Sequence, residues 1–355
     1  MLGMMTFVGG DDEEEGPNNC QELGDTDGLL RFFRLVIENR DACISTTEPR
    51  YRKSARGFSG AFSTATGLVL SQVGRVWSYL LYFFFMDNSE RGGSLSNIHA
   101  HYNLSNDLFD VFLDSETRMY SSAIYEGGGV LGQFGGTLEE AQVRKLDTLC
   151  SKLGLCKAGP RLKLLDIGFG WGGLSIHAAK YYNCDVVGIT LSVEQWEGAM
   201  KRVKKEGLER RIEFLVIDYR AFAREGRNHM AFDRVVSCEM IEAVGHNHLG
   251  EFFAAAEAVL APGGVLVMEA ITTPEMRYET YRRSADFINT IVFPGSCCPS
   301  LHALVDAAQK ESVLSLEVSN RASHVVRRQQ SMKLTRSIFL LRLIGTFFIH
   351  FACRN

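Results

Sequence analysis

Short apolar runs alternate with longer amphipathic stretches through the middle of the chain. The runs have the length of buried β-strands, and the amphipathic stretches have the spacing of helices that cover a sheet. Strands that alternate with helices in this way predict an α/β fold with a doubly wound, mostly parallel sheet. The expected strands are residues 162–167, 185–190, 212–217, 233–238 and 265–270, and the expected helices are residues 172–181, 192–206 and 252–260.

Two polar quartets have the pattern of a capping box, in which the first and last side chains satisfy free N–H groups at a helix start. Residues 137–140 (TLEE) predict a helix that runs to Leu153, and residues 192–195 (SVEQ) open the helix after the second strand. Residues 262–264 (PGG) end the helix that precedes the fifth strand. These signals support the helix assignments.

The amino-terminal part of the chain differs from this core. An acidic run at residues 11–15 predicts a disordered tail. A basic patch at residues 50–56 predicts a solvated face, and the alternative is contact with anionic lipid headgroups. Residues 58–86 predict a helix, and a polar, Gly-rich linker at residues 87–96 marks a domain boundary. The expected organisation is a disordered acidic tail (1–28), an amino-terminal helical segment and linker (29–96), a catalytic domain (97–324) and a divergent carboxyl-terminal tail (325–355).

Two apolar stretches approach the length of a membrane-spanning helix, at residues 76–86 and 338–353. Both fall short of the roughly 20 apolar residues that a spanning helix needs, and the second contains Arg342 and His350. We therefore expect each stretch to be a helix of the core. The alternative is a segment that lies on a membrane surface.

The composition is that of an ordinary globular protein, with 46% hydrophobic and 23% charged residues and a formal net charge of −4. This charge gives no reason to expect a nucleic-acid partner. The nine cysteines include no Cys-x-x-Cys pair, so we expect no metal site. The odd cysteine count and the lack of a secretory signal predict reduced thiols and a cytoplasmic protein.

A glycine-rich stretch joins the first expected strand to its helix, at residues 164–180 (LLDIGFGWGGLSIHAAK). Gly168, Gly170 and Gly172 let the backbone turn sharply and let a ligand lie against bare main chain. The helix start adds free N–H groups and a partial positive charge. A Gly-x-Gly turn on its own is weak evidence for a cofactor site. The pattern that begins at Asp166 looks like the site of an S-adenosylmethionine (SAM) methyltransferase, and the alternative is a tight turn without a ligand.

In a parallel sheet, ligands bind at the carboxyl ends of the strands. The loops that follow the expected strands are therefore the candidates for a binding site. They are residues 168–173, 190–195, 218–220, 239–246 and 271–274.

Eight motifs resemble the cyclopropane-fatty-acyl-phospholipid synthase family, which includes the mycolic acid cyclopropane synthases. They follow one another in the family's order from about residue 99 to residue 324. The resemblance implies the class I SAM-dependent methyltransferase fold. The motifs are HYNLSNDLFDVFLD (101–114), MYSSAIYE (119–126), the glycine-rich stretch (164–180), VVGITLSVEQ (186–195), DYR (218–220), FDRVVSCEMIEAVGH (232–246), APGGVLVMEAIT (261–272) and YRRSADFINTIVFPGSCCPS (281–300).

By this resemblance the cofactor is SAM, which would lie against the glycine loop. The loop after the second strand would flank its adenosine, and the loop after the third strand would lie near the adenine. The segment before the core would close over it. The implied cofactor-binding residues are Tyr120, Ser121, Asp166, Gly168, Gly170, Trp171, Gly172, Thr190, Leu191, Ser192, Gln195, Asp218 and Tyr219.

The resemblance also implies transfer of the SAM methyl carbon to the cis double bond of an unsaturated fatty acyl chain of a phospholipid, forming a cyclopropane. Attack of the alkene leaves a carbocation, which aromatic walls stabilise and water would capture. A base must then remove a proton from the added methyl group. In the family this base is a bound bicarbonate ion, held by protein groups. The residues here implied to take part are Glu242, Ser122, Glu269 and Ile271.

Several positions depart from the family pattern. Ser122 stands where the family has Cys, and its hydroxyl can still donate a hydrogen bond. Glu269 stands where many members have His, and an acid there repels an anion unless it is protonated. After His324 the sequence no longer matches the family's carboxyl-terminal part.

We therefore expect a lipid-modifying enzyme in the cytoplasm that contacts the membrane surface, where its phospholipid substrate lies. Two alternatives remain open from the sequence. One is a SAM-dependent methyltransferase that acts on a small amine, and the other is an inactive relative that binds SAM or lipid.

Overall fold

The computed structural model describes residues 88–90, 93–102, 109, 113–125, 136–312, 314–320 and 345–352. All of them belong to one compact unit. The expected acidic tail, the basic patch and the helix predicted for residues 58–86 lie outside the described residues.

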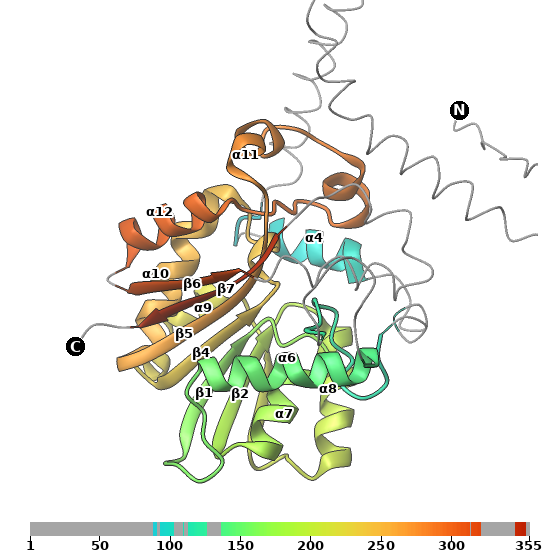
Figure 1. The fold of residues 1–355 in the computed structure, drawn as a ribbon, viewed down its shortest axis with the longest axis vertical. Coiled ribbons are helices and arrows are strands. Elements are labelled where there is room, and N and C mark those ends of the chain that lie inside the picture. Colours follow the sequence, from blue (N-terminus) through green and yellow to red (C-terminus); the bar gives the residue numbers. More distant parts are fainter. Residues whose placement is uncertain are drawn as a thin grey trace, which may run out of the picture. The chain divides into compact units, whose positions relative to one another are not determined.

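The core is a sheet of seven strands in the order β3-β2-β1-β4-β5-β7-β6 (Figure 1). The first five strands are parallel, as the sequence predicted, and β7 pairs antiparallel with both β5 and β6. The strands are β1 (Leu162–Ile167), β2 (Cys184–Thr190), β3 (Ile212–Val216), β4 (Phe232–Cys238), β5 (Leu260–Thr272), β6 (Ser315–Asn320) and β7 (Gly345–Ala352).

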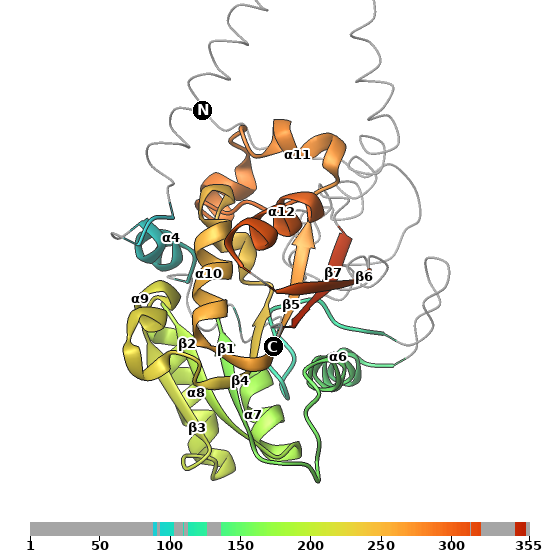
Figure 2. The same ribbon diagram turned by 90° about the vertical axis from the view of Figure 1, so that its left-hand side faces the viewer.

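Helices cover both faces of the sheet, with α6 on one side of the strands and α10 on the other (Figures 1 and 2). Both predicted capping signals are present: Thr137 and Glu140 form a reciprocal capping box, and Ser192 accepts the N–H of Gln195. The described helices are α4 (Gly93–Tyr102), α6 (Leu138–Lys152), α7 (Gly173–Tyr181), α8 (Val193–Glu206), α9 (Tyr219–Arg224), α10 (Leu249–Val259), α11 (Glu275–Tyr281) and α12 (Leu301–Glu311).

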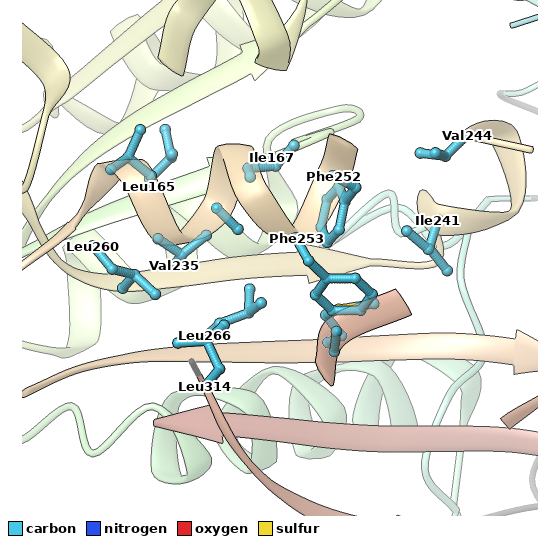
Figure 3. Packing of buried hydrophobic residues seen from close by; sticks show 14 of the residues in the cluster. Leu165, Ile167, Val235, Ile241, Val244, Phe252, Phe253, Leu260, Leu266 and Leu314 are labelled. Atoms are coloured by element: carbon cyan, nitrogen blue, oxygen red, sulfur yellow. The ribbon is translucent and has the colours of Figure 1, made fainter. Parts of the chain in front are cut away.

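One hydrophobic core lies between the sheet and the helices α9, α10 and α12. Leu165, Val235 and Leu266 project from three adjacent strands into this core. Phe252 and Phe253 of α10 lie in the same cluster, beside Val235 (Figure 3). Full burial of a side chain of this size stabilises the fold by roughly 1.5–3 kcal/mol.

A second core lies on the opposite face, under α6, α7 and α8. Leu164, Val236 and Val267 are the strand neighbours of the residues on the first face, and they pack here with Leu146 and Leu149 of α6. Successive strand residues point to opposite faces, so a sheet covered on both sides needs continuous apolar runs. The runs seen in the sequence are explained by this arrangement.

Two sequence predictions are wrong. Residues 93–96, placed in a linker, begin helix α4. Residues 345–352, predicted as part of a core helix over 338–353, form strand β7. This segment (GTFFIHFA) is rich in β-branched and aromatic residues, and β5 and β6 each offer it an edge for pairing. Among the described helices, none has the length and apolarity needed to cross a membrane.

Candidate cofactor and active site

The glycine loop between β1 and α7 has positive φ angles, which glycine adopts without strain. Gly168 has φ +81°, and a Cβ added there would lie 2.7 Å from Cγ of Met240. Gly170 has φ +56°, and nothing lies within 4 Å of a Cβ added at this position. Gly168 is therefore needed for packing, whereas Gly170 borders open space against which a ligand could lie.

Helix α7 begins at this loop without a side-chain cap, because its N-cap residue is Gly172. Its first N–H groups and the positive end of its dipole are available to a polar ligand. Asp166 is buried beneath the loop and accepts the hydroxyl of Ser175 at 2.6 Å. Burial raises the pKa of Asp166 to about 7, against the effect of this hydrogen bond. In the described structure Asp166 thus ties strand to helix.

The loop after β2 holds four of the predicted cofactor-binding residues. Thr190 donates its hydroxyl to Oε1 of Gln195 at 3.0 Å, and Ser192 accepts the N–H of Gln195 at 3.2 Å. Leu191 lies half-buried between them. These contacts fix the loop at the carboxyl end of β2, beside the glycine loop.

The third predicted loop begins with Asp218, which accepts the backbone N–H of Arg220 at 2.8 Å and its guanidinium at 2.9 Å. Burial opposes ionisation, but these hydrogen bonds prevail and lower the pKa of Asp218. Arg220 also donates to the carbonyl of Asn88 and the hydroxyl of Ser94, which attaches α4 to this end of the sheet. The buried hydroxyl of Tyr219 has no hydrogen-bond partner among the described residues.

The segment 113–121 is held against the glycine loop. Its buried Asp114 accepts the N–H and the hydroxyl of Thr117, the latter at 2.7 Å. Arg202 of α8 donates to the carbonyls of Thr117 at 3.1 Å and Trp171 at 2.6 Å. Arg202 therefore joins the segment to the loop, a role that the sequence did not reveal.

Aromatic rings gather beside the loop. Phe109 contacts Tyr120 edge-on at 5.6 Å and Trp171 at 5.7 Å between ring centroids. Tyr120 stacks with Phe293 at 6.3 Å. The buried Nε1 of Trp171 has no partner in the described part of the chain. Aromatic faces of this kind stabilise a nearby cation without reacting with it.

A buried ion pair joins α6 to β5. Lys145 of α6 is 0% exposed and Glu269 of β5 is 1% exposed, and their charged atoms are 3.9 Å apart. Lys145 also donates to the hydroxyl of Ser121, and the thiol of Cys238 donates to Glu269 at 2.9 Å. The ammonium group of Lys145 offsets the charge of Glu269, which was expected to repel an anion unless protonated. Lys145 lies on the buried face of α6, between Ala141 and Leu149. A lysine on an otherwise apolar helix face is the feature of the sequence from which a buried partner could have been inferred.

Two further carboxylates contact the predicted catalytic group: Glu242, which was predicted, and Glu239, which was not. Oε1 of Glu239 accepts both the N–H of Ser122 at 2.9 Å and its hydroxyl at 2.5 Å. Oε1 of Glu242 accepts the N–H of Ile271, and its buried Oε2 has no partner among the described residues. Burial, followed by the charge of Glu239, raises the pKa of Glu242 to about 8. The structure thus joins Ser122 to Glu239 and Ile271 to Glu242.

These residues do not fit a bound bicarbonate ion. The hydroxyl and N–H of Ser122 and the N–H of Ile271 are the donors that would hold such an anion, and protein carboxylates already accept from all of them. An added anion would also face Glu239 and Glu242. The residues do fit SAM, because the open space at Gly170 and the uncapped helix start offer room and N–H donors. In the described ranges, no group of three or more His, Cys, Asp or Glu side chains could hold a metal ion.

The sequence model of the mycolic acid cyclopropane synthetase family matches residues 90–330. The chain belongs to this family. The resemblance inferred from the motifs is therefore confirmed, and with it the class I methyltransferase fold.

Named relatives in this family act on lipids. The chain is 37% identical to tuberculostearic acid methyltransferase UfaA1 of Mycobacterium tuberculosis over 252 residues, which is 70% of this chain and 56% of that protein. It is 35% identical to cyclopropane-fatty-acyl-phospholipid synthase of Escherichia coli K12 over 214 residues, 60% of this chain and 50% of that one. The chain thus spans about half the length of these relatives.

A solved structure from the family has the same fold. The mycolic acid cyclopropane synthase CmaA1, complexed with SAH and CTAB, is similar with a TM-score of 0.61 and 27% sequence identity. The similarity covers 73% of this chain and 98% of that one.

Proposed function

We propose that this chain uses SAM to convert the cis double bond of an unsaturated phospholipid acyl chain into a cyclopropane. The observation that carries the proposal is the aromatic group of Phe109, Tyr120, Trp171 and Phe293 next to a glycine loop that borders open space at Gly170. Membership of the family supports it.

Three loops at the carboxyl edge of the sheet would hold the cofactor. When bound, SAM would supply an electrophilic methyl carbon to the π electron pair of the alkene, and the S–C bond pair would stay on sulfur. The uncapped start of α7 donates N–H groups, and the rigid loop at Thr190 and Gln195 fixes the position of the neighbouring wall. The unpartnered hydroxyl of Tyr219 and Nε1 of Trp171 can each make a hydrogen bond to a ligand.

The aromatic rings serve the step that follows methyl transfer. The acyl chain then carries a positive charge on the carbon next to the new bond, and the faces of Tyr120 and Phe293 can stabilise it. The polar groups assigned to the same step are Ser122, Glu242, Glu269 and Ile271.

The lipid acceptor is supported by the relatives' names. One is a synthase of cyclopropane fatty acyl phospholipids, and another is a methyltransferase named for a fatty acid. The structure of CmaA1 with SAH and CTAB pairs a SAM-derived molecule with a long-chain amphiphile. A phospholipid substrate requires contact with a membrane surface, so we expect peripheral membrane association.

Methyl transfer to a small amine is a second candidate. It is favoured by the engagement of Ser122 and Ile271 with carboxylates, because amine methylation needs no bound bicarbonate.

The test uses purified chain, SAM and vesicles that contain either cis-unsaturated or fully saturated phospholipid. Acyl chains heavier by one methylene should form only from the unsaturated vesicles. Unchanged lipid, together with methylation of soluble amines such as ethanolamine derivatives, would favour the second candidate instead.

A further inference from the structure

Glu239 adopts a backbone conformation that is unfavourable for any residue with a side chain. Its φ angle is +47°, in the left-handed region. Such a conformation costs about 1–3 kcal/mol and persists where surrounding contacts impose it. At Glu239 those contacts are the two hydrogen bonds from Ser122 and the bond from its own N–H to the carbonyl of Glu269 at 2.7 Å. The chain thus places a carboxylate on the Ser122 donors in spite of the strain.

We propose that Glu239 is an internal replacement for the bicarbonate ion, and that Glu242 itself takes the proton from the methyl group added to the acyl chain. The proposal rests on the proposed cyclopropane synthesis and concerns how that reaction ends. It follows from the occupied donors at Ser122 and Ile271 and from the unpartnered Oε2 of Glu242.

The proton transfer balances without a further reactant. The added methyl group loses a proton to Oε2 of Glu242, and the electron pair of that C–H bond closes the third bond of the ring. This bond neutralises the positive charge on the neighbouring carbon. Glu242 returns its proton to solvent before the next turnover, and no oxidant or reductant is needed.

The charges around Glu242 suit this role. Burial and then Glu239 raise the pKa of Glu242 to about 8, which makes it a stronger base than an exposed carboxylate. Glu269 of β5 also raises the pKa of Glu242. Glu269 in turn pairs with Lys145 of α6 and accepts a hydrogen bond from the thiol of Cys238 at the end of β4. Turnover should therefore rise with pH up to about pH 8, as Glu242 loses its proton.

NMR of ¹³C-labelled bicarbonate tests whether Glu239 keeps bicarbonate from the Ser122 donors. The measurement needs no turnover. The wild-type chain should not broaden the bicarbonate signal. Glu239→Gly should bind bicarbonate, because it frees the Ser122 donors, and glycine accepts the positive φ without strain. Glu239→Gln is the matched control. It keeps an oxygen on Ser122, so it should remain closed to bicarbonate.

Wild-type binding as tight as that of Glu239→Gly would overturn the proposal. A second arm measures lipid turnover in buffer freed of carbon dioxide. The wild type should keep its rate within about twofold, while Glu242→Gln should lose about 10²-fold or more with or without bicarbonate. A wild-type rate that falls without bicarbonate also overturns the proposal. If no variant converts lipid under any condition, the proposed function fails, and the binding arm alone decides whether Glu239 fills the anion site.

Discussion

Replacement of Glu242 by Gln should stabilise the fold, and the gain should grow with pH. Burial and Glu239 raise the pKa of Glu242 from 4.5 to about 8. Between these values the folded protein keeps a proton that the unfolded chain releases. The stability contributed by the protonated carboxyl is present in full below pH 4.5 and is lost as pH rises towards 8. At roughly 1.4 kcal/mol per pKa unit, the loss is on the order of 3 kcal/mol at pH 7 and 5 kcal/mol well above pH 8.

The Gln side chain has nearly the same shape and cannot ionise, so this pH dependence disappears in the variant. Urea unfolding of both proteins between pH 5 and pH 8 measures the difference in the free energy of unfolding. The difference should widen by about 4 kcal/mol over this range. The exposed Glu213 provides the control. The free energy of unfolding of Glu213→Gln should change with pH in parallel with that of the wild type. If the free energies of unfolding of Glu242→Gln and the wild type also changed in parallel with pH, the raised pKa of Glu242 and its role as the base would be refuted.

Other substitutions separate folding from binding. Lys145→Met should cost about 3–5 kcal/mol in urea unfolding because it removes the cation that offsets the charge of the buried Glu269, and Glu269→Gln added to it should recover much of the loss. Absence of that recovery would contradict the ion pair. Gly170→Ala should cost only about 1 kcal/mol of stability yet weaken SAM binding in calorimetry, whereas Gly168→Ala should lower Tm more through its clash with Met240. Equal losses of Tm in the two variants would contradict the open space at Gly170.

Much of the fold could be predicted because local patterns determine it. The five parallel strands were visible in the sequence as apolar runs. The capping residues Thr137 and Ser192 marked two helix starts. Strand β7 was not visible, because a short apolar run has the same composition in a buried helix and in a strand. Its pairing with β5 and β6 depends on contacts far away in the sequence.

Only the part of the candidate site that a local motif determines could be predicted from the sequence. The glycine loop is one continuous motif, so its place at the strand end could be inferred. Lys145 and Glu239 gain their importance only from partners that are distant in the sequence, Glu269 and Ser122. The sequence therefore suggested that Glu269 would repel an anion, whereas the structure pairs it with a buried cation.

The most direct test of cyclopropane synthesis uses SAM with a fully deuterated methyl group and vesicles of cis-unsaturated phospholipid. Ring closure removes one hydrogen isotope from the transferred carbon, so mass spectrometry should find acyl chains that have lost the double bond and kept two of the three deuterons. Acyl chains that keep all three deuterons would mean methyl transfer without ring closure. That result, or lipid that stays unlabelled while SAM binds, would contradict the account.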